Sequence, residues 1–104
     1  MAVITVQGEA STTGTILWKC PKNKTAKFEL ITCTNTTGSY EIILSRFNNS
    51  TGSLVTIYKF TLDNGDFFSD SNNYFLKSDD QLILTSSILG TSYTAQFAYE
   101  DAIN

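Results

Sequence analysis

Five aspartates lie close enough in the sequence to be considered as a chemical site: Asp63, Asp66, Asp70, Asp79 and Asp80. Two carboxylates can serve glycoside hydrolysis, and several carboxylate oxygens can bind calcium. Nearly all five fall in stretches that favour turns. The stretch from Asp63 to Asp66 also lacks the ligand spacing of the helix–loop–helix calcium loop. We therefore interpret these residues as turn-forming and solubilising, and we predict no metal site.

The chain contains no histidine, which limits the enzymatic mechanisms open to it. A nucleophilic serine needs a base to take its proton, and that base is usually histidine. Serine with lysine is formally possible, but no motif marks such a pair. Gly8 and Gly14 are too far apart for a phosphate-binding loop, and no lysine follows at the required place. The sequence predicts no catalytic residues, no cofactor and no enzyme activity.

Cys20 and Cys33 are the only cysteines of the chain. If the segment ending at Cys20 pairs with the next strand across a turn at Pro21–Lys24, Cys33 lies several residues farther along. At about 3.3 Å per residue, this separation exceeds the limit of about 7 Å between the Cα atoms of a disulfide. We expect two reduced thiols, largely packed inside the protein.

Length and composition favour a single domain over residues 1–104. Charged residues make up only 16% of the chain, and the Thr, Ser and Asn that replace them suit strand surfaces and turns. The net charge of −3 argues against nucleic acid as a partner, because phosphates require a basic surface. No apolar run approaches the roughly 20 residues of a membrane span. Met1–Gln7 does not have the pattern of a secretory signal peptide.

Strand-like runs separated by short polar loops fill the chain. The central three, Thr25–Asn35, Tyr40–Phe47 and Ser53–Leu62, are joined by short turn-rich loops, which predicts an antiparallel meander. Further runs are Val3–Gln7, Thr15–Lys19, Tyr74–Leu76, Gln81–Ser86 and Ser92–Glu100, with a brief apolar pair at Phe67-Phe68. The pattern predicts an all-β, single-domain antiparallel β-sandwich of about eight strands, jelly-roll-like, with an up-and-down arrangement as the alternative.

Alternation along each run predicts which side chains meet the core. In Thr25–Asn35 the predicted core face consists of Ala26, Phe28, Leu30 and Thr32. The predicted core aromatics are Tyr40, Tyr58, Phe60, Tyr93, Phe97 and Tyr99. Neither face of the central strands is purely polar, so we expect the second face to be covered by a loop or another subunit.

Four aromatic residues are harder to place inside and are candidates for an interface: Trp18, Phe47, Phe67 and Phe68. Phe67 and Phe68 are adjacent, so in an extended chain they face opposite ways. An exposed aromatic residue in a small acidic sandwich favours a protein interface. A carbohydrate-binding platform is the alternative.

The N-terminal segment, residues 1–14, is expected to be either a first strand or an arm that reaches a neighbouring subunit. Val3, Ile4 and Val6 belong to a β-prone run, whereas Gly8–Gly14 predicts a flexible loop behind it. These three residues therefore join the aromatic candidates for an interface.

A series of turn motifs gives the chain a family resemblance. One strand runs into Pro21-Lys22-Asn23-Lys24-Thr25-Ala26, and a later one ends at Asn35-Thr36-Thr37-Gly38-Ser39. Tyr74-Phe75-Leu76-Lys77-Ser78-Asp79-Asp80-Gln81-Leu82 follows, and the last strand closes with Phe97-Ala98-Tyr99-Glu100-Asp101. This order resembles small virion proteins of tailed bacteriophages, namely capsid decoration (cement) proteins and related neck or tail-fibre modules. The chain departs from the pattern at Asn23, where glycine is more usual, and at Ser78-Asp79-Asp80, which replaces Gly-Asp.

The resemblance implies a structural protein with no catalytic residues to carry over. It places the protein in the virion, made in the host cytoplasm, without specifying the part of the particle. Our leading hypothesis is a capsid decoration protein that binds the outer shell of a tailed phage head. The implied partners are the major capsid protein or other virion proteins, and further copies of the chain. A neck or tail-fibre module and a glycan-binding β-sandwich are the alternatives. Nucleic acid, membranes and cofactors are not expected partners.

Overall fold

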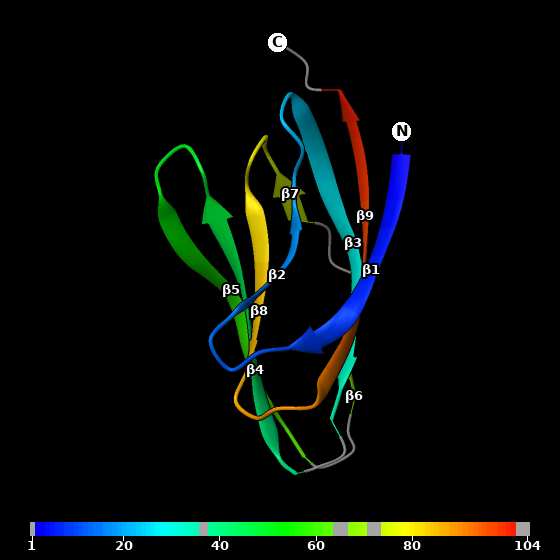
Figure 1. Cartoon of the computed structure of the whole chain (residues 1–104), viewed down its shortest axis with the longest axis vertical. Helices are drawn as coiled ribbons and strands as arrows, with labels where there is room; N and C mark the ends of the chain where they lie inside the picture. The colour runs from blue at the N-terminus through cyan, green and yellow to red at the C-terminus, as the bar shows by residue number, and fades with distance from the viewer. Residues whose placement is uncertain (1, 36–37, 64–66, 71–73, 102–104) are drawn as a thin grey trace.

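The computed structural model describes residues 2–35, 38–63, 67–70 and 74–101, with the backbone alone described at 67–70 and 74. Within these ranges, nine strands form two antiparallel sheets that pack face to face (Figure 1). The strands are β1 (Ala2–Ala10), β2 (Thr15–Lys19), β3 (Lys24–Thr34), β4 (Tyr40–Asn48), β5 (Ser53–Leu62), β6 (Phe67–Asp70), β7 (Tyr74–Leu76), β8 (Gln81–Ser86) and β9 (Thr91–Asp101).

The first sheet has the order β1–β9–β3, with β6 and β7 both pairing with β3, and the second has the order β2–β8–β4–β5. The prediction of an all-β antiparallel sandwich is therefore confirmed. The structure shows no helix in the described ranges that is long and apolar enough to cross a membrane.

One hydrophobic core fills the space between the two sheets. Phe28 and Phe97 of the first sheet and Ile42, Leu44 and Leu84 of the second have no exposed surface. Tyr40, Tyr93 and Phe97 are buried as predicted, and Tyr58 and Tyr99 pack partly buried against the core. The prediction is wrong for Phe60, whose side chain is 46% exposed, because β5 is an edge strand with a sheet neighbour on one side only.

The predicted meander of three consecutive strands is wrong at its first step. β3 lies in the first sheet and β4 in the second, so only β4 and β5 form a hairpin. The crossing between sheets begins at Asn35, which is 1% exposed and donates hydrogen bonds to Leu89 O and Thr91 Oγ1, each at 2.9 Å. These buried bonds to the turn between β8 and β9 satisfy a polar group that the crossing takes out of water.

A bulge in β3 overturns half of its predicted core face. The register against β9 shifts between Phe28 and Leu30, and one extra residue in a strand sends the following side chains to the opposite faces. Ala26 and Phe28 are buried as predicted, but beyond the bulge Ile31 and Cys33 are buried and Leu30 is exposed.

The N-terminal run forms a longer strand than predicted. β1 pairs with β9 from Ala2 to Ala10, so Gly8 to Ala10 belong to the strand and not to a loop. A side chain at Gly8 would place its Cβ 3.1 Å from Tyr93 Oη. A residue without a Cβ therefore lets β1 lie close to the buried tyrosine. In this structure the segment is a strand of the chain's own sheet.

Both cysteines are free and buried, and the expected packing of the thiols is confirmed. Burial raises the pKa of Cys33 to about 12. Burial, with the nearby charges of Asp80 and Asp79, raises the pKa of Cys20 to about 11. The assumed pairing of the segment before Cys20 with the next strand is wrong, because β2 pairs with β8 and β3 lies in the other sheet.

Candidate functional site

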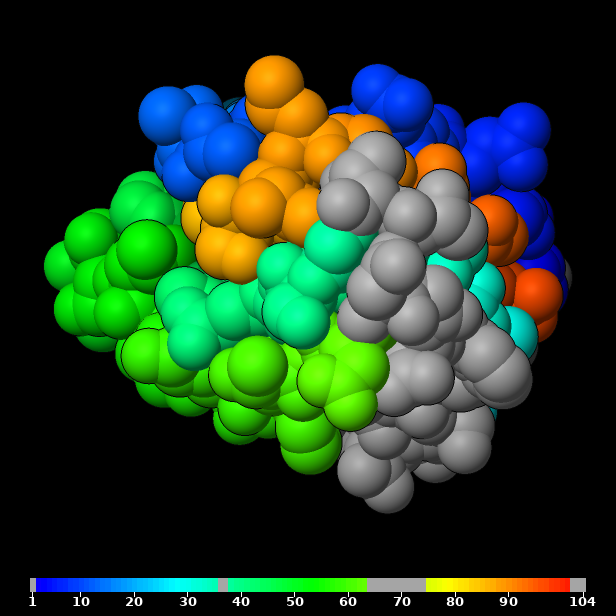
Figure 2. All heavy atoms as spheres, turned by 90° about the horizontal axis from the view of Figure 1, so that it is seen from below, coloured from blue at the N-terminus to red at the C-terminus, as the bar shows by residue number. Residues whose placement is uncertain are grey.

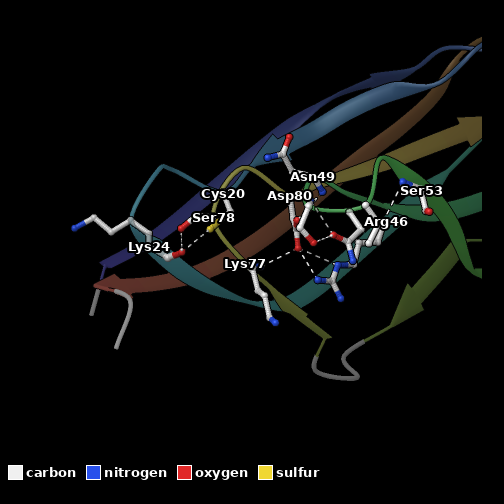
Figure 3. Close-up of polar contacts among 11 residues, drawn as sticks. Cys20, Lys24, Arg46, Asn49, Ser53, Lys77, Ser78 and Asp80 are labelled. Carbon is white, nitrogen blue, oxygen red and sulfur yellow. Dashed lines mark hydrogen bonds and ion pairs between the residues drawn. The ribbon is translucent and has the colours of Figure 1, made fainter. Parts of the chain in front are cut away.

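A buried carboxylate lies where separate segments of the chain meet (Figure 3). Asp80, at the turn between β7 and β8, is 2% exposed. Its Oδ2 accepts hydrogen bonds from Arg46 Nε at 3.1 Å, Arg46 Nη2 at 2.5 Å and the Lys77 backbone N–H at 3.0 Å. Its Oδ1 accepts one from the Asn49 backbone N–H at 3.0 Å. One side chain thus joins β4, the β4–β5 hairpin and the turn after β7.

The electrostatics of this cluster favour a charged Asp80. Burial by itself raises the pKa of the carboxyl group, but the backbone N–H groups of Asn49 and Lys77 and the Arg46 guanidinium together outweigh it, and the pKa lies below its usual range. A carboxylate held by these donors is not poised to exchange protons near neutral pH. The cluster therefore stabilises the fold and does not form an acid–base site.

The backbone around Asp80 ties the second sheet to the turn that follows β2. Cys20 N–H donates to Asp80 O, and Asp79 N–H donates to Cys20 O, both at 2.9 Å. Asp79 has a φ of +68°, a left-handed conformation that aspartate tolerates better than most residues. Ser78 Oγ donates to Lys24 O at 2.8 Å, which anchors the start of β3 to the same turn.

The interpretation of the aspartates as turn-forming holds for Asp80, whose backbone N–H donates to Lys77 O at 3.0 Å. The interpretation as solubilising is wrong for it, because its side chain is buried. The only arginine of the chain, Arg46, marked a candidate partner for a buried carboxylate. The sequence did not indicate which acidic residue it meets. Asp63 is exposed and Asp79 is partly exposed, 3.8 Å from Lys19. Asp66 and the side chain of Asp70 lie outside the described residues. In the parts that the structure describes, no three His, Cys, Asp or Glu residues gather as a metal site.

The five predicted interface residues whose side chains the structure describes lie on three different strands, β1, β2 and β4. Val3 is 59% exposed on β1, whereas Ile4 and Val6 of the same strand pack partly buried against the core. Trp18 is half-buried, with its ring 4.7 Å from that of Phe97 and 5.6 Å from that of Tyr99, so it helps to close the core.

The remaining three candidates lie on other strands. Phe47 is half-buried near the end of β4, in the second sheet. Phe67 and Phe68 form part of β6, which pairs with β3 in the first sheet. Their side chains lie outside the description, so their role at an interface stays a prediction.

An apolar edge that the sequence did not single out lies along β5 and β7 of the described sandwich. Leu54, Val55 and Phe60 of β5 are 61%, 55% and 46% exposed, and Phe75 of β7 is 69% exposed. A groove of about 240 Å³ between these strands is lined by Arg46, Asn48, Val55, Ile57 and Phe75. In the end-on view of Figure 2, the green β4–β5 hairpin lies on the side opposite the dark blue β1. In the sequence, the apolar residues on both faces of Ser53–Leu62 were the feature that could have indicated this exposed apolar edge.

Comparisons with known proteins define the fold of the chain and no closer relationship. No family model and no curated protein matches the chain. A chain of the acid-stable capsid of Helicobacter pylori bacteriophage KHP30 shares the fold at a TM-score of 0.60 and 10% identity, over 100% of this chain and 95% of that one.

Two further solved structures share the fold. A pilus chain from disulfide-linked Bacillus endospore appendages matches at a TM-score of 0.56 and 12% identity, over 98% of this chain and 87% of that one. A chain of the T13 viral particle of IBDV matches at a TM-score of 0.55 and 10% identity, over 94% of this chain and 30% of that one. The protein is thus a two-sheet β-sandwich similar in architecture to capsid and pilus chains.

Proposed function

We propose that this protein is a structural component of a virion, and specifically a decoration protein on the outer shell of a tailed phage head. The observation that carries the proposal is the fold match to a phage capsid chain over the whole length of this chain and 95% of the other. The turn motifs at Pro21–Ala26 and Leu76–Leu82 add the resemblance to small phage virion proteins.

The strand order supports the proposal. The first four strands alternate between the two sheets, whose strand orders are β1–β9–β3–β6 and β2–β8–β4–β5. We infer a jelly roll from this order, an architecture that viral capsid domains use. Because the same architecture occurs in proteins of unrelated function, the proposal is tested by locating the protein.

Locating the protein in purified particles tests the proposal. Immunogold labelling with antibodies against this chain is expected to mark the surface of the phage head. Labelling confined to the tail would replace the decoration role with the neck or tail-fibre role. Absence of the chain from purified particles would reject a virion role altogether.

A filament subunit is the second candidate function, because a pilus chain matches over 98% of this sequence. The assembly of the purified, separately expressed chain distinguishes the two roles. Electron microscopy of the expressed protein would show ordered filaments if the chain assembles by itself as a pilus, and discrete particles or no assembly if it needs a capsid lattice. A glycan array is the corresponding test of the glycan-binding alternative, which specific binding would favour.

A further inference from the structure

The free edge of β5 is the longest unprotected apolar edge in the described part of the sandwich. β5 pairs with β4 on one side and with no other described strand, and it lies at the left border of Figure 1. Seven of its ten residues are exposed. An edge strand presents a row of backbone N–H and C=O groups that can pair with another chain, and monomeric proteins usually protect it with proline or several charges. β5 contains no proline and one charged residue, Lys59.

The register with β4 assigns each β5 side chain to a face of the sheet. Phe60 lies opposite the fully buried Ile42, and Val55 lies opposite Arg46, which itself lies opposite the fully buried Leu82. Directly opposed residues share a face, so Phe60 and Val55 are on the core side of the sheet. Leu54, Thr56, Lys59 and Thr61 are on the outer side.

A bulge between Thr56 and Tyr58 breaks the alternation of β5. Leu44 pairs with Tyr58 and Ser45 with Thr56, so Ile57 is the extra residue. Ile57 and Tyr58 are both half-buried, unlike the residues that flank them, and both pack against the core. The core-side set is therefore Ser53, Val55, Ile57, Tyr58, Phe60 and Leu62.

This pattern is complementary to itself in one antiparallel register. With a two-fold axis between Ile57 and Tyr58, Phe60 lies opposite Val55 of a second copy, and Lys59 lies opposite Thr56. Leu54 then lies opposite Thr61, Ser53 opposite Leu62, and the two bulges face each other. Every pair shares a face over all ten residues. A shift by one residue places core-side residues opposite outer ones along nearly the whole strand. A shift by two does so at the bulge alone, where Ile57 would lie opposite Thr56 or Tyr58 opposite Lys59.

The charges of the strand are compatible with the same register. Lys59 is 3.7 Å from Glu41 of its own chain and faces an uncharged threonine of the second copy. The two Lys59 residues are offset by three positions, which separates them by about 10 Å along the strands, close to the screening length at physiological salt. No like charges are opposed.

We propose that two copies of this chain associate through antiparallel pairing of β5 with β5, which joins their four-stranded sheets into one. A two-fold contact of this kind is closed and does not propagate into a fibre. The contact between the two β5 strands covers Val55 and Phe60. It also covers one side of the groove that Arg46 and Val55 line. The inference deepens the proposed virion role, in which many copies meet, but it is tested in solution, so its failure leaves the particle-labelling test unaffected.

The edges formed by β2 and β1 fit this role less well. β2 has five residues and an irregular register against β8. β1 has nine residues but exposes only one large apolar side chain, that of Val3. Since β1 lies on the opposite side of the molecule from β5 (Figure 2), substitutions on the two edges can be assessed separately.

Light scattering coupled to size exclusion, over a range of concentrations, tests the pairing on the full chain. The wild-type protein is expected to dimerise, and Val55→Glu is expected to weaken dimerisation at least tenfold, because it places a carboxylate opposite Phe60 of the second copy. The double variant Val55→Glu with Phe60→Lys restores dimerisation, since each introduced carboxylate then faces an introduced ammonium. Leu89→Glu, at a 73% exposed residue in the loop between β8 and β9, is the matched control that leaves the dimer intact.

A cross-linking experiment fixes the register independently of these variants. Single variants Thr56→Cys and Lys59→Cys, mixed and oxidised, are expected to form a disulfide between unlike chains, because directly opposed Cβ atoms lie about 5 Å apart. Thr56→Cys alone gives no cross-link. A protein that stays monomeric overturns the proposal. So does an assembly that Val3→Glu abolishes and Val55→Glu does not, or cross-linking between like chains only.

Discussion

Replacing Asp80 by Asn tests whether the buried carboxylate holds the turns of the sandwich together. The substitution keeps the size of the side chain but removes its charge. The amide oxygen can still accept from Arg46 and Lys77, as Oδ2 does. The NH₂ group in the place of Oδ1 cannot accept the hydrogen bond that the Asn49 backbone N–H donates. Removing one partner of a buried pair costs about 3–5 kcal/mol. The Arg46 side chain is 30% exposed, so water partly hydrates its charge once the carboxylate is gone. We therefore expect a loss of stability at the lower end of this range, about 3 kcal/mol.

Urea and thermal unfolding measure this loss. About 3 kcal/mol corresponds to a fall in Tm of about 12 °C or more for a domain of this size. The matched control is Asp79→Asn at the neighbouring position. Asp79 is partly exposed and 3.8 Å from Lys19, and asparagine tolerates its φ of +68°, so we expect a change below about 1 kcal/mol. Equal effects of the two variants would refute the proposed role of Asp80.

The pH dependence provides a second readout. The pKa of Asp80 is lowered in the folded state, so its contribution to stability is complete well above the unfolded pKa of about 3.9. It is lost as the pH falls through the lower folded pKa. The wild-type protein should therefore lose stability more steeply below about pH 4 than Asp80→Asn does. Parallel acid unfolding profiles of the two proteins would contradict the pKa shift.

Three further predictions concern β1 and the cysteines. Deletion of Met1–Gln7 should lower the Tm of the isolated chain by about 10 °C or more, because Ile4 and Val6 pack against the core. An unchanged Tm with lost assembly would instead favour the arm. Gly8→Ala should destabilise the protein by about 1 kcal/mol in urea unfolding, since its Cβ would lie 3.1 Å from the Tyr93 hydroxyl, and an unchanged midpoint would show that the tyrosine moves aside. A thiol reagent at pH 7 should label neither cysteine until urea is added, because both thiols are buried with a raised pKa; rapid labelling of the folded protein would contradict this burial.

Local pattern determined which segments of this chain are strands. Val3–Gln7, Thr15–Lys19 and Gln81–Ser86 all lie within strands of the structure, because β-branched and alternating residues favour extended backbone wherever the chain places them. The same alternation placed Tyr40, Tyr93 and Phe97 in the core, and they lie in stretches of β4 and β9 where buried and more exposed residues alternate.

Tertiary structure decided which strands are neighbours. A loop of four residues fits a hairpin as well as a crossing between sheets, so the segment after Asn35 gave no local sign that β3 and β4 part. The bulge that turns Leu30 outward is likewise set by pairing with β9. The burial of Asp80 could not be predicted from its local sequence either, because its partners Arg46 and Asn49 are more than thirty residues away in the sequence. A turn motif specifies the backbone of the turn, whereas the burial of its carboxylate depends on the donors that folding brings to it.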